Sequence, residues 1–174
     1  NSVHDNDVQY TGMDPRADGT YETREGQTTG SVNQRVGFSV FDGYADVYSN
    51  MVRDVGRRAG VSPAAHGFSI ASVYATASEF PLSTSGDTYD PTFPFTAKVY
   101  NNVVARCDDR GNRLAAASTD APAYVIYSYC NTIVDNTLVG QTSEGNMTGF
   151  IKNNIFAGNG TNAPSGPLTA ADNL

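Results

Sequence analysis

The sequence predicts an all-β solenoid, in which the chain winds repeatedly through short parallel strands. Three observations support this fold class: a recurring asparagine motif, a recurring glycine-led strand and a composition rich in strand and turn formers. Hydrophobic residues make up 39% of the 174 residues and charged residues only 17%, with 17 glycines and 8 prolines. Because Asn, Gly and Ser favour turns while Val, Ile, Tyr and Thr favour strands, this balance favours β-structure.

The asparagine motif reads branched apolar, any residue, polar, Asn, any residue, apolar. It occurs as VYSNMV, VYNNVV, IVDNTL and IKNNIF, and the first residues, NSV, fit its end. Its asparagines are Asn1, Asn50, Asn102, Asn136 and Asn154, with spacings of 49, 52, 34 and 18. A loose period in the twenties, or twice that length, is typical of stacked β-coils with insertions.

Asparagine has a physical reason to recur at a sharp turn between strands. It tolerates a left-handed backbone better than other residues except glycine, and stacked asparagines can hydrogen-bond through their amides as a ladder. We therefore expect Asn102 to adopt a left-handed or bridge conformation within such a ladder. The flanking apolar residues are expected to point inward and stack: Val47 and Val52, Val99 and Val104, Ile133 and Leu138, Ile151 and Phe156.

A glycine-led strand is the other repeated element. GFSVFDG (37–43) and GFSIAS (67–72) begin 30 residues apart, and AYVIYSYC (123–130) has the same place before IVDNTL. Each coil is thus expected to hold one glycine-led strand, a turn and a pair of strands hinged at the asparagine. The alternative over residues 44–60 is an amphipathic helix, since Tyr44, Val47, Met51 and Val55 share one helical face. The later copies hold too many β-branched residues and asparagines for a helix, so the repeat is preferred.

With these motifs, the chain resembles the right-handed parallel β-helix of the pectate-lyase type, which carries an asparagine ladder at the corresponding hinge. The resemblance covers most of residues 37–160. It implies one domain over residues 1–174, with coils mainly at 37–160, excursions at 14–35 and 81–94, and a loop tail at 161–174. Neither end carries a cap, so we expect further β-helix sequence or another chain, as in a homotrimer, to complete the fold.

The net charge and the sequence motifs limit the functions that the chain can have. A net charge of -7 argues against binding nucleic-acid phosphates, and no run of about 18 apolar residues could span a membrane. No CxxC, HExxH, P-loop or GxSxG motif occurs. The composition suits an extracellular protein or one on a cell or virion surface. Cys107 and Cys130 form either one disulfide or two buried thiols.

The resemblance implies that a long ligand binds along an outer sheet, flanked by the longest turns. The predicted turns at 54–66 and 108–120 gather most basic side chains beside paired acids. Glycoside hydrolysis requires two carboxylates around the bond, whereas elimination requires a base and an Arg or Ca²⁺ to neutralise a uronate carboxylate. The candidate catalytic residues are His66, Asp108, Asp109, Arg110 and Arg113, and the candidate substrate-binding residues are Arg57, Arg58, Tyr127 and Tyr129. The alternative for DDRGNR is a solvated turn with local salt bridges, and the identity of any metal is left open.

Two further features bear on this site. AHGFSIAS is similar to the GHG-x-SIGS segment of polygalacturonases, which implies that His66 lies beside catalytic acids, although the NTD and double-Asp motifs of that family have no match upstream. The alternative is that His66 is a turn or groove residue. Strand alternation places Tyr127 and Tyr129 on one face and Tyr124 on the other, where exposed rings stack on sugars and buried rings fill a core.

Two functions remain at this point. The preferred one is a polysaccharide lyase or hydrolase, and the alternative is a non-catalytic structural or adhesive β-helix, such as a tailspike or a cell-surface protein. Because one architecture serves both, the site must decide between them.

Overall fold

The computed structural model describes residues 2–9, 35–41, 45–55, 65–71, 96–116 and 124–174. Every regular element in these ranges is a β-strand, and the described residues contain no helix. The predicted all-β class is therefore confirmed. The helix considered over residues 44–60 is wrong for the part that is described, because Ala45–Tyr48 and Met51–Arg53 are strands.

Three sheets, which we call A, B and C, contain these strands, and every strand pair within them is parallel. Sheet A contains, in spatial order, β1 (Ser2–His4), β4 (Ala45–Tyr48), β7 (Thr96–Tyr100), β10 (Tyr124–Tyr129), β13 (Met147–Lys152) and β15 (Thr169–Ala171). Sheet B contains β2 (Asp7–Gln9), β5 (Met51–Arg53), β8 (Val103–Ala105), β11 (Thr132–Val134) and β14 (Ile155–Ala157). Sheet C contains β3 (Arg35–Phe41), β6 (Ala65–Ala71), β9 (Arg110–Ala115) and β12 (Val139–Glu144).

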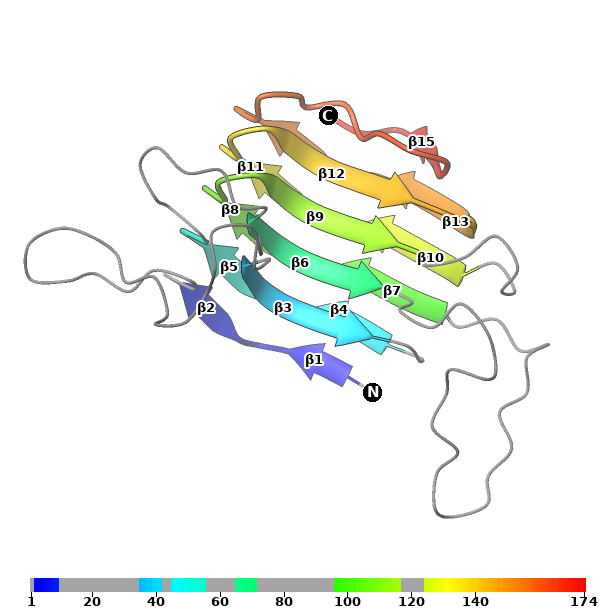
Figure 1. Ribbon diagram of the computed structural model, residues 1–174, viewed down its shortest axis with the longest axis horizontal. Coiled ribbons are helices and arrows are strands. Elements are labelled where there is room, and N and C mark those ends of the chain that lie inside the picture. The colour runs from blue at the N-terminus through cyan, green and yellow to red at the C-terminus, as the bar shows by residue number, and fades with distance from the viewer. Residues whose placement is uncertain (1, 10–34, 42–44, 56–64, 72–95, 117–123) are drawn as a thin grey trace, which may run out of the picture.

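The chain visits the three sheets in a fixed order, A then B then C, and then returns to A. Each such visit, which we call a round, places its strands beside those of the previous round, as Figure 1 shows. The strands β1 to β12 form four rounds, β13 and β14 begin a fifth, and β15 returns to sheet A. The expectation of three strands per repeat is thus confirmed.

Two details of the expected repeat are wrong. Residues 123–130 do not match the glycine-led strands, because β10 pairs in sheet A while β3 and β6 pair with β9 in sheet C. The tail at 161–174 is not entirely loop, because β15 pairs with β13. The predicted excursions at 14–35 and 81–94 lie outside the described residues, except for Arg35, which begins β3.

The core fills the space between the sheets with inward side chains that stack at matching positions in successive rounds. Val47 pairs in register with Val99, Val99 with Ser128 and Ser128 with Ile151, and all four side chains are buried. Stacked branched side chains bury apolar area at roughly 25 cal/mol per Å², which stabilises each round against the next. Leu138 was expected in this core, but half of its surface is exposed (50%).

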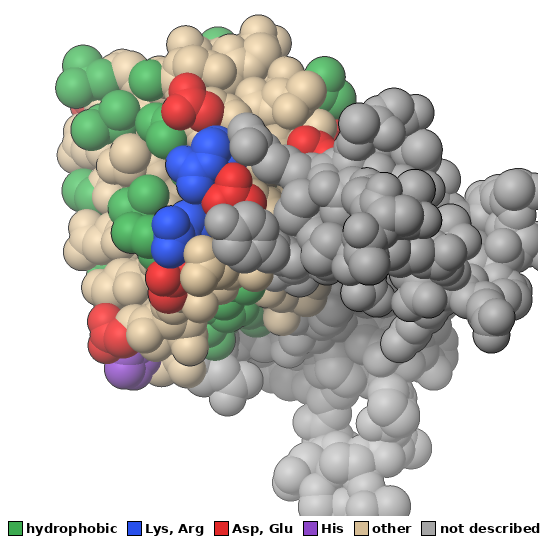
Figure 2. Space-filling view, turned by 90° about the vertical axis from the view of Figure 1, so that its left-hand side faces the viewer, with side chains coloured by type: hydrophobic (Ala, Val, Ile, Leu, Met, Phe, Trp, Pro, Cys, Tyr) green, Lys and Arg blue, Asp and Glu red, His purple; other side chains and the backbone are tan. Residues whose placement is uncertain are grey.

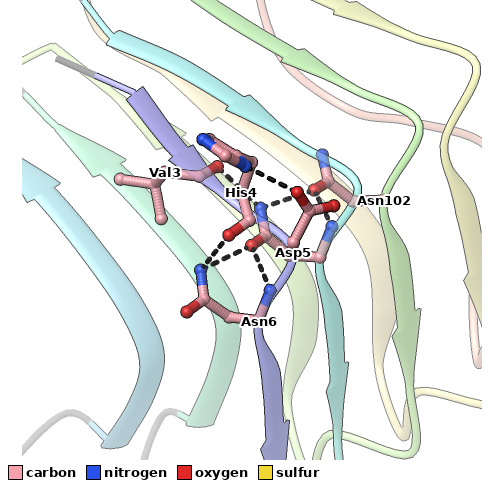
Figure 3. A network of polar contacts seen from close by, with 6 residues as sticks. Val3, His4, Asp5, Asn6 and Asn102 are labelled. Atoms are coloured by element: carbon pink, nitrogen blue, oxygen red, sulfur yellow. Dashed lines mark hydrogen bonds and ion pairs between the residues drawn. The ribbon is translucent and has the colours of Figure 1, made fainter.

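An asparagine ladder connects the rounds at the corner between sheets A and B. Its members, in order, are Asn6, Asn50, Asn102, Asn131, Asn154 and Asn173. Each Oδ1 accepts the backbone and side-chain N–H groups of the preceding asparagine, as in the pair Asn50 and Asn102, where both distances are 3.0 Å. The Asn102 amide also donates to the Val47 carbonyl at 2.9 Å. Figure 3 shows the start of this ladder around Asn6 and Asn102.

The ladder differs from the sequence prediction in its members and its backbone. The left-handed residue directly precedes each ladder asparagine, so Asn101 (φ 54°) and not Asn102 has that conformation. Asn136 belongs to a second corner, between sheets B and C, where its Oδ1 accepts the Cys107 N–H and its amide donates to Asn159 at 2.7 Å. Asn131 takes its place in the first ladder, and Asn1 is outside the described residues.

Candidate functional site

A charged cluster lies on the outer face of sheet C, where β9 departs from strict alternation. Gly111 and Asn112 both face the interior: a Cβ on Gly111 would lie 3.0 Å from the Asn136 Nδ2, and the Asn112 amide bonds the buried Gln141 at 3.1 Å. Since these two consecutive residues turn inward, Arg110 and Arg113 come to share the outer face. In an undistorted strand, residues three apart would point to opposite faces.

Glu144 joins the two arginines across neighbouring strands. Its Oε1 accepts a short hydrogen bond from the Arg110 Nη1, and its Oε2 accepts one from the Arg113 Nη2 at 3.2 Å. The Arg110 guanidinium also donates to the Thr142 hydroxyl at 3.3 Å. Glu144 was missed in the sequence, where the signal was the match between RGNRLA and VGQTSE, two glycine-led strands that pair in register.

Asp109 and His66 complete the cluster at its other end. The Asp109 Oδ2 lies 3.6 Å from the Arg110 Nε and 3.6 Å from the His66 Nδ1. His66 lies in β6, where it pairs in register with Arg110. The structure therefore brings together four of the five predicted catalytic residues. Asp108 lies in the turn before β9, where its backbone N–H donates to the Val55 carbonyl at 3.1 Å.

Two predicted local structures at this site are wrong. Residues 108–120 are not one long turn, because residues 110–115 form β9 and pair on both sides with sheet C. His66 is not a turn or groove residue, because it is a strand residue with only 1% of its side chain exposed. In both cases pairing with the neighbouring round, which a single segment does not reveal, gives the polar residues a strand conformation.

The two carboxyl groups of the cluster have pKa values shifted in opposite directions. Burial raises the pKa of Asp109, and the charge of Glu144 adds to this effect, while Arg110 opposes it. Burial alone would also raise the pKa of Glu144, but Arg113 and Arg110 outweigh it, so that this pKa is lowered. Because the two carboxyl groups differ in burial and in the charges around them, Asp109 holds a proton to higher pH than Glu144 does.

His66 is held neutral in this environment. Burial, followed by the charges of Arg110 and Arg113, lowers the pKa of His66 to about 4. Neither ring nitrogen has a hydrogen-bond partner among the described residues. A buried polar group without a hydrogen-bond partner is costly in free energy, and the charged form of His66 would cost more still.

The remaining predicted site residues lie elsewhere. Tyr127 and Tyr129 are on the outer face of sheet A and Tyr124 is buried, so their predicted alternation is confirmed, but sheet A does not contain the charged cluster. Arg57 and Arg58 lie outside the described residues. Cys107 is buried and Cys130 is exposed, and both are free thiols.

Other ion pairs also bridge consecutive rounds. Arg53 pairs with Asp7 at 3.1 Å, and Arg106 makes a two-pronged contact with Asp54 at 2.8 and 2.7 Å. Figure 2 shows acidic and basic side chains alternating along the side of the molecule that carries the strands of sheet B. The sheet C cluster combines two acids, two arginines and a buried histidine, with Arg110 in contact with both acids.

Within the described residues, no three His, Cys, Asp or Glu side chains lie close enough together to hold a metal ion. The same part of the chain has no helix with the length and hydrophobicity needed to cross a bilayer. The chain matches no family model, no curated protein and no solved structure. Function is therefore inferred from the site itself.

Proposed function

We propose that this chain forms a right-handed parallel β-helix of an extracellular or surface protein, and that it cleaves a polysaccharide on the outer face of sheet C. The fixed order of visits to three parallel sheets and the asparagine ladder support the β-helix. A long parallel sheet face offers an extended surface, which suits a polymeric substrate, and the sheet C cluster lies on such a face.

One observation carries the catalytic part of the proposal: Asp109 and Glu144 contact two nitrogens of the same Arg110 guanidinium, yet their pKa values move apart. Sharing one guanidinium keeps the carboxyl groups within about 10 Å of each other, the range that glycoside hydrolases use. Asp109, which holds its proton to higher pH, is assigned as the general acid that protonates the glycosidic oxygen. Glu144, the stronger acid, acts as base or nucleophile.

The test is hydrolysis of a panel of neutral and uronate-containing polysaccharides, followed by the appearance of reducing ends. Replacing Asp109 by Asn or Glu144 by Gln should each lower the rate at least about 100-fold, since general acid–base groups contribute about that much or more. Asp7→Asn is the matched control, because it removes a similar inter-round ion pair from sheet B and should leave the rate unchanged. Equal activity of all three variants would contradict the assignment.

Elimination is a second candidate, favoured by Arg110 and Arg113, which lie together beside Glu144. In that reaction Asp109 removes the proton next to a uronate carboxylate, while Arg110 and Arg113 neutralise that carboxylate. The electron pair of the broken C–H bond forms the new C=C bond. The glycosidic oxygen leaves with the electron pair of the C–O bond and takes up a proton from the protonated base. Unsaturated products, detected by their ultraviolet absorbance, would identify elimination. Binding without either kind of product would instead identify a non-catalytic, adhesive β-helix.

A further inference from the structure

A row of aromatic rings crosses the outer face of sheet A, away from the charged cluster. His4, Tyr48, Tyr100 and Tyr129 are register neighbours on consecutive strands. Their rings stack nearly parallel, with centroid separations of 4.8, 5.1 and 5.0 Å and interplanar angles of 12°, 10° and 2°. The separation follows from the spacing of β-strands, about 4.8 Å. A phenol ring therefore recurs at regular intervals along this face, at Tyr48, Tyr100 and Tyr129.

The row ends in an open aromatic corner. Phe150 is tilted by 41° against Tyr127 at 4.9 Å and by 49° against Tyr129 at 6.2 Å. Tyr48 and Tyr100 have both ring faces covered by neighbours in the row, so they present ring edges and hydroxyl groups to solvent. The tilt at Phe150 interrupts this close stacking, and 36% of its surface is exposed. Ring faces are thus accessible at this corner rather than along the row.

The charges on this face are balanced, although the whole chain carries a net charge of -7. The chain has only two lysines, Lys98 and Lys152, and both lie on sheet A. Lys152 pairs with Asp172 at 3.3 Å, and Lys98 has Asp46 as its register neighbour. The Tyr100 phenol remains uncharged, since desolvation, together with the charge of Asp46, raises its pKa.

We propose that the tyrosine row and the corner of Tyr127, Tyr129 and Phe150 form a binding surface for an uncharged polysaccharide, separate from the site on sheet C. This inference rests on the proposed function for the identity of the polymer class, and adds a second contact surface for it. The apolar face of a sugar ring packs against an accessible aromatic face, whereas its hydroxyl groups exchange hydrogen bonds with phenols.

Two features favour a neutral polymer over other occupants. A linear array of phenol rings, with centroids 5.1 and 5.0 Å apart, can contact successive units of a linear chain in the same way. The balanced charges on this face match an uncharged chain, and a polyanion would gain little here while meeting repulsion from the acidic molecule. A protein partner would require an apolar interface core of larger area, whereas the part of this face outside the corner presents mainly ring edges, hydroxyls and paired charges.

The experiment measures binding to insoluble glucan and mannan by depletion from solution, with soluble polygalacturonate as an anionic comparison. All proteins carry Glu144→Gln, so that cleavage does not remove the ligand. Phe150→Ala and Tyr127→Ala should each weaken binding to one of the neutral polymers about tenfold. Tyr100→Phe, which keeps the ring and removes one hydroxyl, should weaken it roughly threefold. Met51→Ala on the outer face of sheet B, where Met51 is 41% exposed, is the control and should bind as before.

Several results would overturn this inference. The first is that Phe150→Ala and Tyr127→Ala bind as before with an unaltered melting temperature. The second is that the protein binds neither neutral polymer. The third is that it prefers polygalacturonate. Dimerisation by sedimentation that the same substitutions abolish would assign the face to a second copy. The two proposals fail separately. If the wild type cleaves the polymer and Phe150→Ala and Tyr127→Ala bind it as before, only this surface is rejected. If those variants lose binding and the wild type forms no cleavage products, only the catalytic site is rejected.

Discussion

At the scale of the residue, Asn102 shows why the ladder positions are restrictive. Its side chain accepts two N–H groups from Asn50 and donates to the Val47 carbonyl and to Asn131. Leucine has a similar volume but makes none of these bonds, so that buried groups lose their partners. We expect Asn102→Leu to lower the free energy of unfolding by about 3 kcal/mol, as measured by urea denaturation.

The neighbouring residue provides the control for this prediction. Asn101 is exposed and left-handed (φ 54°), a backbone conformation that glycine adopts without strain. Asn101→Gly should therefore change the free energy of unfolding by less than about 1 kcal/mol. If both substitutions have the same small effect, the ladder does not contribute to stability in the way its geometry implies.

His66 makes the stability of the fold depend on pH in the acidic range. Because its pKa falls from 6.5 in the unfolded chain to about 4 in the fold, the unfolded state binds the additional proton between these values. The free energy of unfolding is therefore unaffected by His66 above about pH 6.5. It decreases by up to about 3 kcal/mol as the pH falls toward 4. The pH dependence of urea denaturation should show this loss, and His66→Gln should reduce its slope between pH 4 and 6.5. An identical slope in the variant would contradict the assignment.

At the scale of the element, a column of glycines allows sheet C to approach sheet B. Its members are Gly37, Gly67, Gly111 and Gly140, one in each strand of sheet C. A Cβ on Gly67 would overlap the Val104 Cγ1 on sheet B and lie 2.6 Å from the Gly111 carbonyl oxygen. These glycines are thus required by close approach of two layers and not by a left-handed backbone. This explains the glycine-led strands noticed in the sequence.

Gly67→Ala should accordingly cost about 1 to 3 kcal/mol through overpacking. Adding Val104→Ala removes the overlapping methyl group, so the double variant should be less destabilised than the sum of the two single variants. Thermal unfolding of the four proteins in this cycle provides the measurement. Strict additivity would mean that the two residues do not contact each other.

At the scale of the whole molecule, stability is expected to vary along the stack of rounds. Strands β7 and β10 have neighbours on both sides and bury Val99 and Ile126 completely, whereas β15 lies at a sheet edge with exposed residues. Hydrogen exchange should be at least about 100-fold slower for amides in β7 and β10 than in β15, because edge strands can open without disrupting the core. Uniform protection across sheet A would indicate that the rounds unfold only as one unit.

Much of the repeat is visible in the sequence because each round imposes the same local demands. Asn50, Asn102 and Asn154 were placed correctly from their motif, and Val3 to Val8 carries that motif in full around Asn6, although NSV was chosen instead. Asn131 was missed because Ser128 stands where the other copies have a branched apolar residue. That serine is accommodated because its hydroxyl donates to Gln141 at 2.9 Å inside the core.

The sequence by itself determined the all-β class, the repeating asparagines and glycines, and the charged segment that begins at Asp108. The fold class and the repeating residues can be read from short segments, because each round places the same local demands on composition and turn chemistry. Only the tertiary structure decided that Asn136 belongs to a second corner, and that Glu144 meets Arg110 and Arg113 from 34 and 31 residues away. Such contacts depend on the register between rounds. Register is set by inward packing and by the insertions between strands, so distant residues meet only when all the rounds are stacked.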